Sequence, residues 1–393
     1  MIKNIAYLMS LFLSVSACVQ QPQGIEVVVT NALDEDRTSE VVTISIDQLK
    51  LEEGQSLTDF GVFDELGSQL IVQPVDSDED GQVDGLLFQP SVKAQSSSTY
   101  VLKPIGAINQ QVADSTCFAR FVPERTDDYA WENDRVAFRT YGPTAQRMIE
   151  EDIPGGTLSS GIDCWLKKVD YPIINKWYKA NDEEPGAYHK DRGEGLDNFH
   201  VGSSRGCGGI AVRDSGAYFI SKNFIAWETK AIGPLSTSFD LEYEDWTAGE
   251  KVISEVKHIS LDKGSNLSKF TIEVGGTAEI SAGLTLHEND GEVTINDAYG
   301  WVSYWQPHAD SYLATALIAA PDAYIGAETY LTDEKDLSNA FMHLKVADGS
   351  VTYYTGFAWQ ESGQFANKEA WENYLTAFAK RLKQPLKVEI KKN

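Results

Sequence analysis

Apolar and polar residues alternate along much of this chain, and the alternation predicts β-strands. In residues 41–46 and again in 236–243, apolar side chains fall at every second position, as expected where one face of a strand packs on a core. Turns rich in Asp, Gly, Ser and Pro separate the runs. The runs before residue 103 predict a small N-terminal sandwich of about the size of an Ig-like module. They are 25–30, 41–46, 60–63, 70–72 and 100–102.

The runs in the second half of the chain are longer and favour wide antiparallel sheets. They are 218–220, 236–243, 252–261, 270–274, 292–295, 301–305, 314–319 and 351–359. One segment near the end has helical spacing instead: it is capped near Asn367 and carries Trp371, Leu375, Phe378 and Leu382 on one face. We therefore predict an all-β fold with a small N-terminal β-sandwich region, a large antiparallel β-sandwich and a C-terminal helix.

The stretch 129–209 follows neither period. Aromatic residues, bases, acids and glycines are mixed here, as in Ser203-Ser-Arg-Gly-Cys-Gly-Gly209. Such a mixture favours a binding surface on irregular backbone over a core element. Trp and Tyr offer flat faces, Arg and Lys offer charged donors, and Gly lets backbone approach a ligand. We interpret this stretch as a site for a sugar acid.

The first residues predict export and lipidation. Lys3 precedes the apolar run Ile5 to Val15, and Val15-Ser-Ala-Cys18 follows. This is typical of a signal peptide (1–17) that ends in a lipobox, with Cys18 lipidated and 18–24 forming a tether. The alternative is an ordinary signal peptide with a chance cysteine. The prediction places regions 25–116 and 117–393 in the periplasm or on the outer membrane of a Gram-negative envelope, with the lipid as the sole membrane anchor.

Composition narrows the choice of partners. The formal charge is -26, from 59 acidic and 33 basic residues. Such a surface repels nucleic acid and anionic membranes, so we exclude both as partners. It also repels an anionic sugar, and therefore a uronate site must be a small pocket with focused positive charge.

Three cysteines remain beyond Cys18: Cys117, Cys164 and Cys207. In an exported protein this number allows one disulfide and one free thiol, and the pairing stays open. A catalytic role for Cys207 is less favoured than a buried structural one. No Cys-x-x-Cys or paired His spacing suggests zinc.

An acidic turn suggests calcium. In Asp76-Ser-Asp-Glu-Asp-Gly-Gln-Val-Asp84, oxygen ligands (Asp76, Asp78, Asp80, Asp84) recur around a glycine. The EF-hand pattern is met only in part, because Leu87 holds the place of its closing Glu, although Asp84 would close a shorter loop. The alternative is an acidic hairpin turn. Any calcium here would be structural, and we expect no cofactor for catalysis.

Several motifs resemble a known family, the former domain-of-unknown-function family that includes ulvan-oligosaccharide dehydratases of marine bacteria. They are Trp131-Glu-Asn-Asp-Arg135, Arg139-Thr-Tyr-Gly-Pro143, Lys176-Trp-Tyr178, Tyr188-His189 and Ser204-Arg-Gly-Cys-Gly-Gly209. The resemblance covers most of the chain after the signal. It implies an antiparallel β-sandwich related to polysaccharide-lyase or mutarotase-like sheets. It also implies elimination of water from a non-reducing-end uronic acid, giving a 4,5-unsaturated product.

This elimination needs three kinds of group. A cation must neutralise the carboxylate, a base must take the C5 proton, and an acid must protonate the leaving C4 hydroxyl. Arg205 is the first candidate for the carboxylate because its fork matches two oxygens, and Lys176 is the second. His189 suits either proton transfer, with Tyr141 or Tyr188 as its counterpart. A tyrosine serves as base where positive charge lowers its pKa.

Further candidates would bind the sugar, namely Trp131, Trp177, Arg139 and His308. Each has a structural alternative, since the tryptophans also suit a core and Arg139 a buried ion pair. Two other functions stay open. The first is a polysaccharide lyase or a glycoside hydrolase that acts on a uronate glycan. A hydrolase needs two carboxylates, and the sequence offers Glu132, Asp134, Asp163, Glu194 and Asp197. A non-catalytic glycan-binding lipoprotein is the other.

Overall fold

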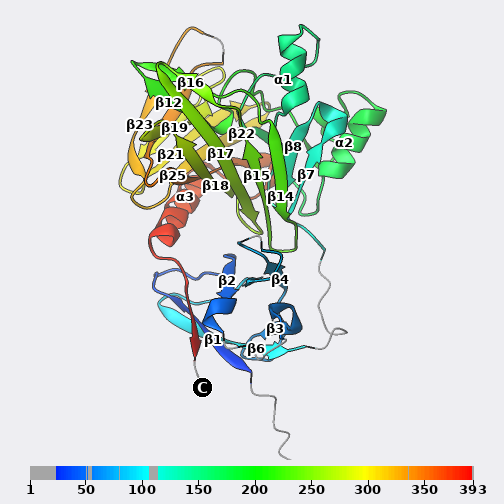
Figure 1. Cartoon of the computed structure of the whole chain (residues 1–393), viewed down its shortest axis with the longest axis vertical. Helices are drawn as coiled ribbons and strands as arrows, with labels where there is room; N and C mark the ends of the chain where they lie inside the picture. The colour runs from blue at the N-terminus through cyan, green and yellow to red at the C-terminus, as the bar shows by residue number, and fades with distance from the viewer. Residues whose placement is uncertain are drawn as a thin grey trace, which may run out of the picture.

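Antiparallel pairing joins every pair of neighbouring strands in the part of the chain that the structure describes. The computed structural model describes residues 24–49, 51, 55–78, 80–105, 114–334 and 336–391. A small body of early strands lies below a larger one (Figure 1). This confirms the predicted all-β, antiparallel fold. Cys18 and the predicted signal lie outside the described residues.

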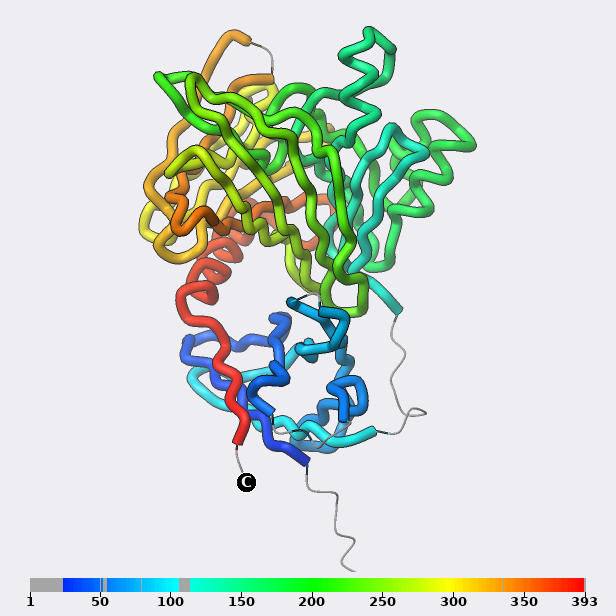
Figure 2. Tube along the Cα trace, viewed as in Figure 1, coloured from blue at the N-terminus to red at the C-terminus, as the bar shows by residue number. Residues whose placement is uncertain are grey.

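The N-terminal module consists of two small sheets that enclose a core around Val27, Ile44, Leu86 and Phe88. The strand order of the first sheet is β26 (Lys387–Lys391), β1 (Ile25–Asn31), β6 (Ser96–Pro104) and β3 (Phe60–Phe63). The strand order of the second sheet is β2 (Val42–Ser45), β5 (Gly85–Phe88) and β4 (Val72–Val75). The final strand thus joins the first, although the sequence analysis placed 387–391 with the large region. Figure 2 shows the chain returning from the upper body to lie beside β1.

A nine-stranded sheet dominates the larger body. Its strands run in the order β14 (Ala226–Ala231), β15 (Ser236–Glu242), β17 (Lys251–Asp262), β18 (Leu267–Gly275), β25 (Ser350–Trp359), β22 (Ser311–Ala319), β21 (Trp301–His308) and β20 (Glu292–Asn296), with β16 (Trp246–Ala248) paired to β17. From Ile253 to Leu261, every second residue of β17 is buried, as in a strand with one face on a core. Two residues of this face, Glu255 and Lys257, are charged and pair with each other at 3.0 Å.

Two five-stranded sheets pack against the nine-stranded sheet and close the main core. One has the order β13 (Ala217–Phe219), β12 (Cys207–Asp214), β19 (Glu279–Thr285), β24 (Asn339–Lys345) and β23 (Tyr324–Tyr330). The other has the order β11 (Gly195–Leu196), β10 (Asp163–Lys167), β9 (Ala137–Thr140), β8 (Asp128–Glu132) and β7 (Phe118–Val122). The second of these sheets carries the candidate site.

Three α-helices cover these sheets in the described residues: α1 (Pro143–Glu150), α2 (Ile174–Glu183) and α3 (Lys368–Lys383). The side chain of Asn367 caps α3, and Trp371, Leu375 and Ala379 are buried against the outer face of β21 and β22. The predicted C-terminal helix is confirmed, with the packed face that its apolar spacing indicated. No helix among the described residues is long and apolar enough to cross a membrane.

The prediction of an irregular binding surface over 129–209 was wrong in its first half. Every residue of β8, β9 and β10 is buried. Polar residues are tolerated inside because they pair: the Lys167 Nζ lies 2.8 Å from the Glu132 carboxylate, and neither side chain is exposed. Sequence periodicity does not show such pairs, because their partners come from different strands.

Candidate functional site

A cavity of about 360 Å³ lies at the end of β9, where the chain turns toward α1. It is lined by Arg139, Tyr141, Thr157, His189, Asp197, Asn198, Phe199, His200, Val201 and Gly202. Gly142 sets the turn that follows Tyr141, because a Cβ at this position would lie only 1.9 Å from the carbonyl oxygen of Asp127. The structure brings Tyr141, Arg139 and His189 into one pocket, which is named the catalytic pocket after the function proposed for it below.

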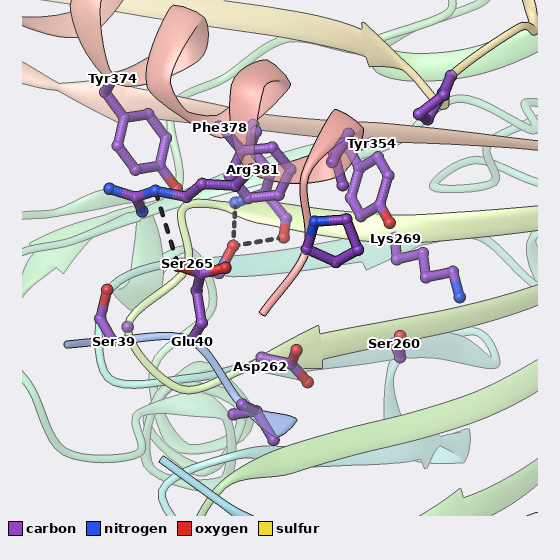
Figure 3. Close-up of a pocket in the computed structure, with 16 residues that line it drawn as sticks. Ser39, Glu40, Ser260, Asp262, Ser265, Lys269, Tyr354, Tyr374, Phe378 and Arg381 are labelled. Atoms are coloured by element: carbon purple, nitrogen blue, oxygen red, sulfur yellow. Dashed lines mark hydrogen bonds and ion pairs between the residues drawn. The ribbon is translucent and has the colours of Figure 1, made fainter. Parts of the chain in front are cut away.

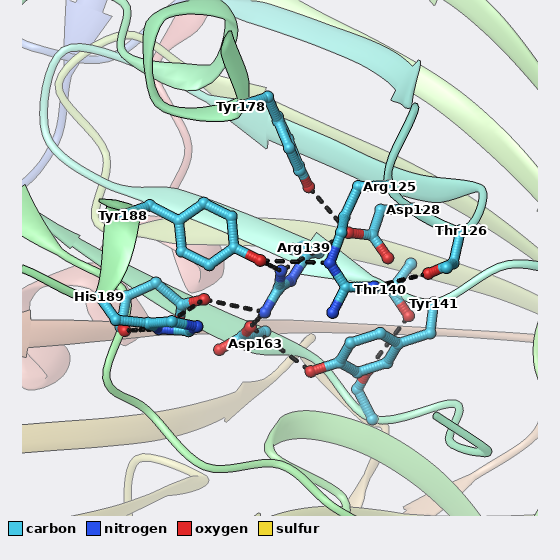
Figure 4. Close-up of polar contacts among 12 residues, drawn as sticks. Arg125, Thr126, Asp128, Arg139, Thr140, Tyr141, Asp163, Tyr178, Tyr188 and His189 are labelled. Atoms are coloured by element: carbon cyan, nitrogen blue, oxygen red, sulfur yellow. Dashed lines mark hydrogen bonds and ion pairs between the residues drawn. The ribbon is translucent and has the colours of Figure 1, made fainter. Parts of the chain in front are cut away.

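Arg139 forms the floor of the catalytic pocket and is only 5% exposed. Its Nε lies 3.0 Å and its Nη2 2.5 Å from Asp163 Oδ2, and the same Nη2 lies 2.9 Å from Asp197 Oδ2 (Figure 4). The Nη1 atom is held less tightly, since the Tyr188 hydroxyl and Asp128 Oδ2 both lie 3.5 Å away. Nη1 thus makes no short hydrogen bond, and its two neighbours both lie outside the lining of the pocket.

The carboxylates around Arg139 share a small, dry space. Burial raises the pKa of Asp128 to about 6, although Arg139 opposes the shift. Burial, together with the neighbouring Asp163, also holds the pKa of Asp197 well above its usual range. Asp128 and Asp197 therefore take up protons more readily than an exposed aspartate does. The pocket is therefore less negative than its residue types suggest, and an anion can enter it.

His189 closes one side of the catalytic pocket, and its side chain is 54% exposed. Its Nδ1 lies 2.5 Å from the backbone carbonyl oxygen of Asp197. Since a carbonyl only accepts, Nδ1 must carry the proton in this contact. In the neutral ring the proton-free nitrogen is then Nε2, whose lone pair is available to act as a base.

Tyr141 lies across the floor of the pocket, and its hydroxyl donates to Asp163 Oδ2 at 3.4 Å. Burial, reinforced by Asp163, holds the pKa of Tyr141 well above its usual range, whereas Arg139 lowers it less than these raise it. The sequence analysis expected positive charge to lower the pKa of a catalytic tyrosine. The opposite shift keeps the hydroxyl protonated, and so Tyr141 suits the role of proton donor.

Sequence reasoning missed Arg125 and Asp128. Arg125 Nε donates to the Tyr188 hydroxyl at 3.2 Å, while Asp128 accepts from the Tyr178 hydroxyl at 3.0 Å. Arg125 ends a short 3-10 turn before Thr126, which has a left-handed backbone. The turn sequence Pro123-Glu-Arg-Thr-Asp-Asp128 precedes the motifs that drew attention, and nothing in its spacing connects it to Tyr188.

Arg205, the first candidate for the substrate carboxylate, does not line the catalytic pocket. It is 2% exposed, and its Nη1 donates to Ser160 Oγ at 2.9 Å and to the Ile210 carbonyl at 3.1 Å. Its side chain occupies space that Gly283 leaves free, because a Cβ at Gly283 would lie 2.7 Å from Arg205 Cγ. Burial lowers its pKa to about 10. The structure makes Arg205 part of the sandwich interior.

The aromatic and lysine candidates for sugar binding lie in different parts of the structure. Trp131 is fully buried, stacks on Phe138 with 5.3 Å between ring centroids, and so belongs to the core rather than to a sugar platform. Lys176, Trp177 and Tyr188 line a different cavity of about 430 Å³. There the Lys176 Nζ lies 2.6 Å from the Glu194 carboxylate. Lys176 therefore lies outside the catalytic pocket.

His308 lies next to the catalytic pocket without lining it. Its Nε2 is 2.8 Å from Oδ1 of Asn198, which is a pocket residue. Burial, together with the nearby His287, lowers the pKa of His308 to about 4. The ring is thus neutral at physiological pH and donates to the Asn198 oxygen, so we assign it to holding Asn198 in place.

The three described cysteines, Cys117, Cys164 and Cys207, are all buried free thiols. The disulfide that their number allowed is absent from the described residues. Burial holds the pKa of Cys164 well above its usual range and raises that of Cys117. Thiols in this state are poor nucleophiles, which favours structural roles for both residues.

Three of the four predicted calcium ligands converge. Carboxylate oxygens of Asp76, Asp78 and Asp80 lie within 4.8 Å of one another. Asp84 instead accepts a hydrogen bond from the Ser77 backbone N–H at 2.9 Å and another from the Ser77 hydroxyl. The converging oxygens are hard donors of the kind that calcium prefers, in the turn between β4 and β5.

We expect calcium to stabilise this turn. Adding millimolar Ca²⁺ should raise the unfolding temperature of the N-terminal module, and a chelator should reverse the shift, because ligand binding favours the folded state. Differential scanning calorimetry measures this directly. An Asp78→Asn variant with an undiminished shift would contradict the assignment, and Mg²⁺ at the same concentration controls for ionic strength.

Comparison with known proteins identifies the family of this chain. The family described as "Domain of unknown function (DUF4861)" matches residues 29–388. "Uncharacterized protein P7" of Formosa agariphila is 50% identical over 381 residues, which cover 95% of this chain and 96% of that protein.

Solved structures resemble this chain at low sequence identity. An alpha-mannosidase from Enterococcus faecalis V583 superposes with a TM-score of 0.50 and 11% identity, over 95% of this chain and 46% of the mannosidase. A glycosyl hydrolase family 38 protein from Enterococcus faecalis gives 0.48 and 10%, over 95% and 48%. The chain spans about half the length of these structures, and the likeness concerns the fold alone. Because the family match and the P7 relative both cover nearly the whole sequence, the chain belongs to the DUF4861 family.

Proposed function

We propose that this protein is a carbohydrate-active dehydratase that eliminates water from a non-reducing-end uronic acid of an oligosaccharide. One observation carries the proposal: the catalytic pocket combines His189, whose Nε2 is proton-free in the neutral ring, with a protonated Tyr141 and a buried Arg139. These are the base, acid and cation that the elimination requires. The resemblance to ulvan-oligosaccharide dehydratases supports the same reaction.

In this reaction His189 Nε2 takes the proton from C5 of the uronate. The electrons of the C5–H bond form the C4=C5 double bond, and the C4–O bond breaks. The Tyr141 hydroxyl gives its proton to the departing oxygen, which leaves as water. Transfer of the proton from His189 back to Tyr141 completes the cycle.

The carboxylate of the sugar would bind near Arg139 Nη1, the nitrogen with two contacts at 3.5 Å. Neutralising this carboxylate makes the C5 proton acidic enough to remove. Arg125 lies on the other side of the Tyr188 hydroxyl and adds a second positive charge. The high pKa values of Asp128 and Asp197 reduce the repulsion that these acids would exert.

Hydrolysis or chain cleavage is the alternative, and a solved structure that shares the fold is an alpha-mannosidase. Hydrolysis needs two carboxyl groups that face the scissile bond. In the catalytic pocket Asp197 is the one carboxylic acid in the lining, whereas Asp128 and Asp163 lie behind Arg139 and are fully buried. The pocket therefore suits a His–Tyr pair better than a pair of carboxylates.

We also propose, from the N-terminal sequence, that Cys18 tethers the protein to the cell envelope.

The products of a treated uronate oligosaccharide test the proposal. We expect ultraviolet absorption from a 4,5-double bond and a mass loss of one water, with the chain length unchanged. Shorter chains would instead identify a hydrolase or lyase, and an unchanged oligosaccharide would identify a non-catalytic binder. An otherwise identical oligosaccharide with a terminal neutral hexose is the control, since it lacks the acidic C5 proton.

A further inference from the structure

A third cavity, also of about 430 Å³, lies where the N-terminal module meets the larger body (Figure 3). Residues 39–41 of the N-terminal module line one side, α3 lines another, and β17, β18 and β25 of the nine-stranded sheet complete it. None of its lining residues belongs to the catalytic pocket. Junctions between structural units are frequent places for ligand sites.

Aromatic rings form one wall of this junction cavity. Tyr354 and Phe378 meet edge to face with 5.1 Å between their centroids, and Tyr374 lies 6.1 Å from Phe378. All three side chains are only partly buried although they pack on the core beneath α3. Their accessible faces are apolar surfaces of the kind on which the C–H groups of a sugar ring pack.

The two cations of the junction cavity each have an acid nearby but keep hydrogen-bond donors: Arg381 Nε lies 3.7 Å from Glu40, and Lys269 acts on Asp262 through its charge alone. Lys269 is exposed, and in the described part of the chain no residue accepts a hydrogen bond from it. Arg381 donates from Nε to Glu35 at 2.9 Å, but its two terminal nitrogens have no hydrogen-bond partner among the described residues. Both cations therefore retain donors for a ligand.

The acids in the lining are less available than these cations. Glu40 accepts from both Nε and Nη2 of Arg37, with the Nε contact at 2.6 Å. Burial raises the pKa of Asp262, whereas the nearby Lys269 opposes the shift. The formal charge of the protein is -26. In such a protein, two incompletely paired cations in one cavity supply local positive charge for an anion.

We propose that the junction cavity is a second binding site, separate from the catalytic pocket, which takes an acidic sugar unit. The sugar ring packs on Tyr354 and Phe378, and its carboxylate or sulfate group accepts hydrogen bonds from Lys269 and Arg381. The choice of an acidic glycan rests on the proposed function. Because residues of both bodies line the cavity, a bound sugar would also hold the N-terminal module against the nine-stranded sheet.

Isothermal titration calorimetry on the full chain tests this site with three probes: a glucuronate disaccharide, a sulfated neutral disaccharide, and cellobiose. We expect acidic probes to bind at two sites in the wild type and to lose affinity about tenfold at one site in Lys269→Gln, the usual effect of a lost hydrogen bond between charged groups. Lys383→Gln is the control, because Lys383 lies in the last turn of α3, which lines the cavity, but is itself outside the lining. Comparing the two acidic probes tells which acid group binds.

Unchanged binding of both acidic probes in Lys269→Gln would overturn the inference, as would equal binding of cellobiose. The result is independent of catalysis. If the protein forms no unsaturated product but still shows Lys269-dependent binding, the dehydratase proposal fails and the second site stands. If product forms and Lys269 is irrelevant to binding, the second site fails alone. A crystal structure with the bound acidic disaccharide shows which cavity is occupied.

Discussion

His189→Ala should lower the turnover of a uronate oligosaccharide by about two to four orders of magnitude, the usual effect of removing an acid-base group. The reason is geometric: the contact from Nδ1 to the Asp197 carbonyl fixes the ring with Nε2 free to take a proton. The initial rate of absorbance increase from the 4,5-double bond measures this directly. Since His189 is more than half exposed, we expect the free energy of unfolding to change little.

His258→Ala provides a matched control. His258 is also partly exposed and also contacts an acid, with its Nδ1 2.7 Å from Asp240, but it lies on β17 outside the catalytic pocket. Its substitution should leave turnover within about twofold. Added imidazole should restore part of the rate of His189→Ala and have no effect on the control. Full activity in His189→Ala would remove this residue from the mechanism.

Arg139→Met should cost about 3–5 kcal/mol in the free energy of unfolding, because it leaves buried carboxylates without their cation. Asp128, Asp163 and Asp197 all surround this guanidinium at 3.5 Å or less, and none is more than 2% exposed. Urea denaturation measures the loss. Activity should also disappear, since the same guanidinium forms the floor of the catalytic pocket.

The cost of Arg139→Met should depend on pH. The pKa of Asp128 is already raised to about 6 in the folded protein, so its protonated form favours folding at low pH and this stability is lost as pH rises from about 4 to 6. Without Arg139 the folded-state pKa of Asp128 rises further, and the variant should lose more stability than the wild type between pH 5 and pH 8.

Arg213→Met is the control for Arg139→Met, since this half-exposed arginine pairs with Glu328 at 3.6 Å and should contribute less than about 1 kcal/mol. Equal losses in both variants would contradict the argument.

The alternation of apolar residues was sufficient to predict the fold class. In β18 one face packs on the core and the other is more exposed, so burial repeats every second residue and is visible in the sequence. The helix α3 was predictable for the same reason, with Asn367 at its start and a periodic apolar face. Such local patterns are determined by neighbouring residues in the chain.

Tertiary structure alone decided which charged residues face a ligand. Arg139 and Arg205 both occur among glycines, aromatic residues and polar residues, and the sequence analysis ranked Arg205 higher for the carboxylate. Arg139 reaches the catalytic pocket because Asp163 and Asp197 arrive from distant segments to hold it, whereas Arg205 fills the space that Gly283 leaves in the interior. A buried charge is stable only when its partners surround it. Those partners lie far apart along the chain, and so the site was determined by packing rather than by local pattern.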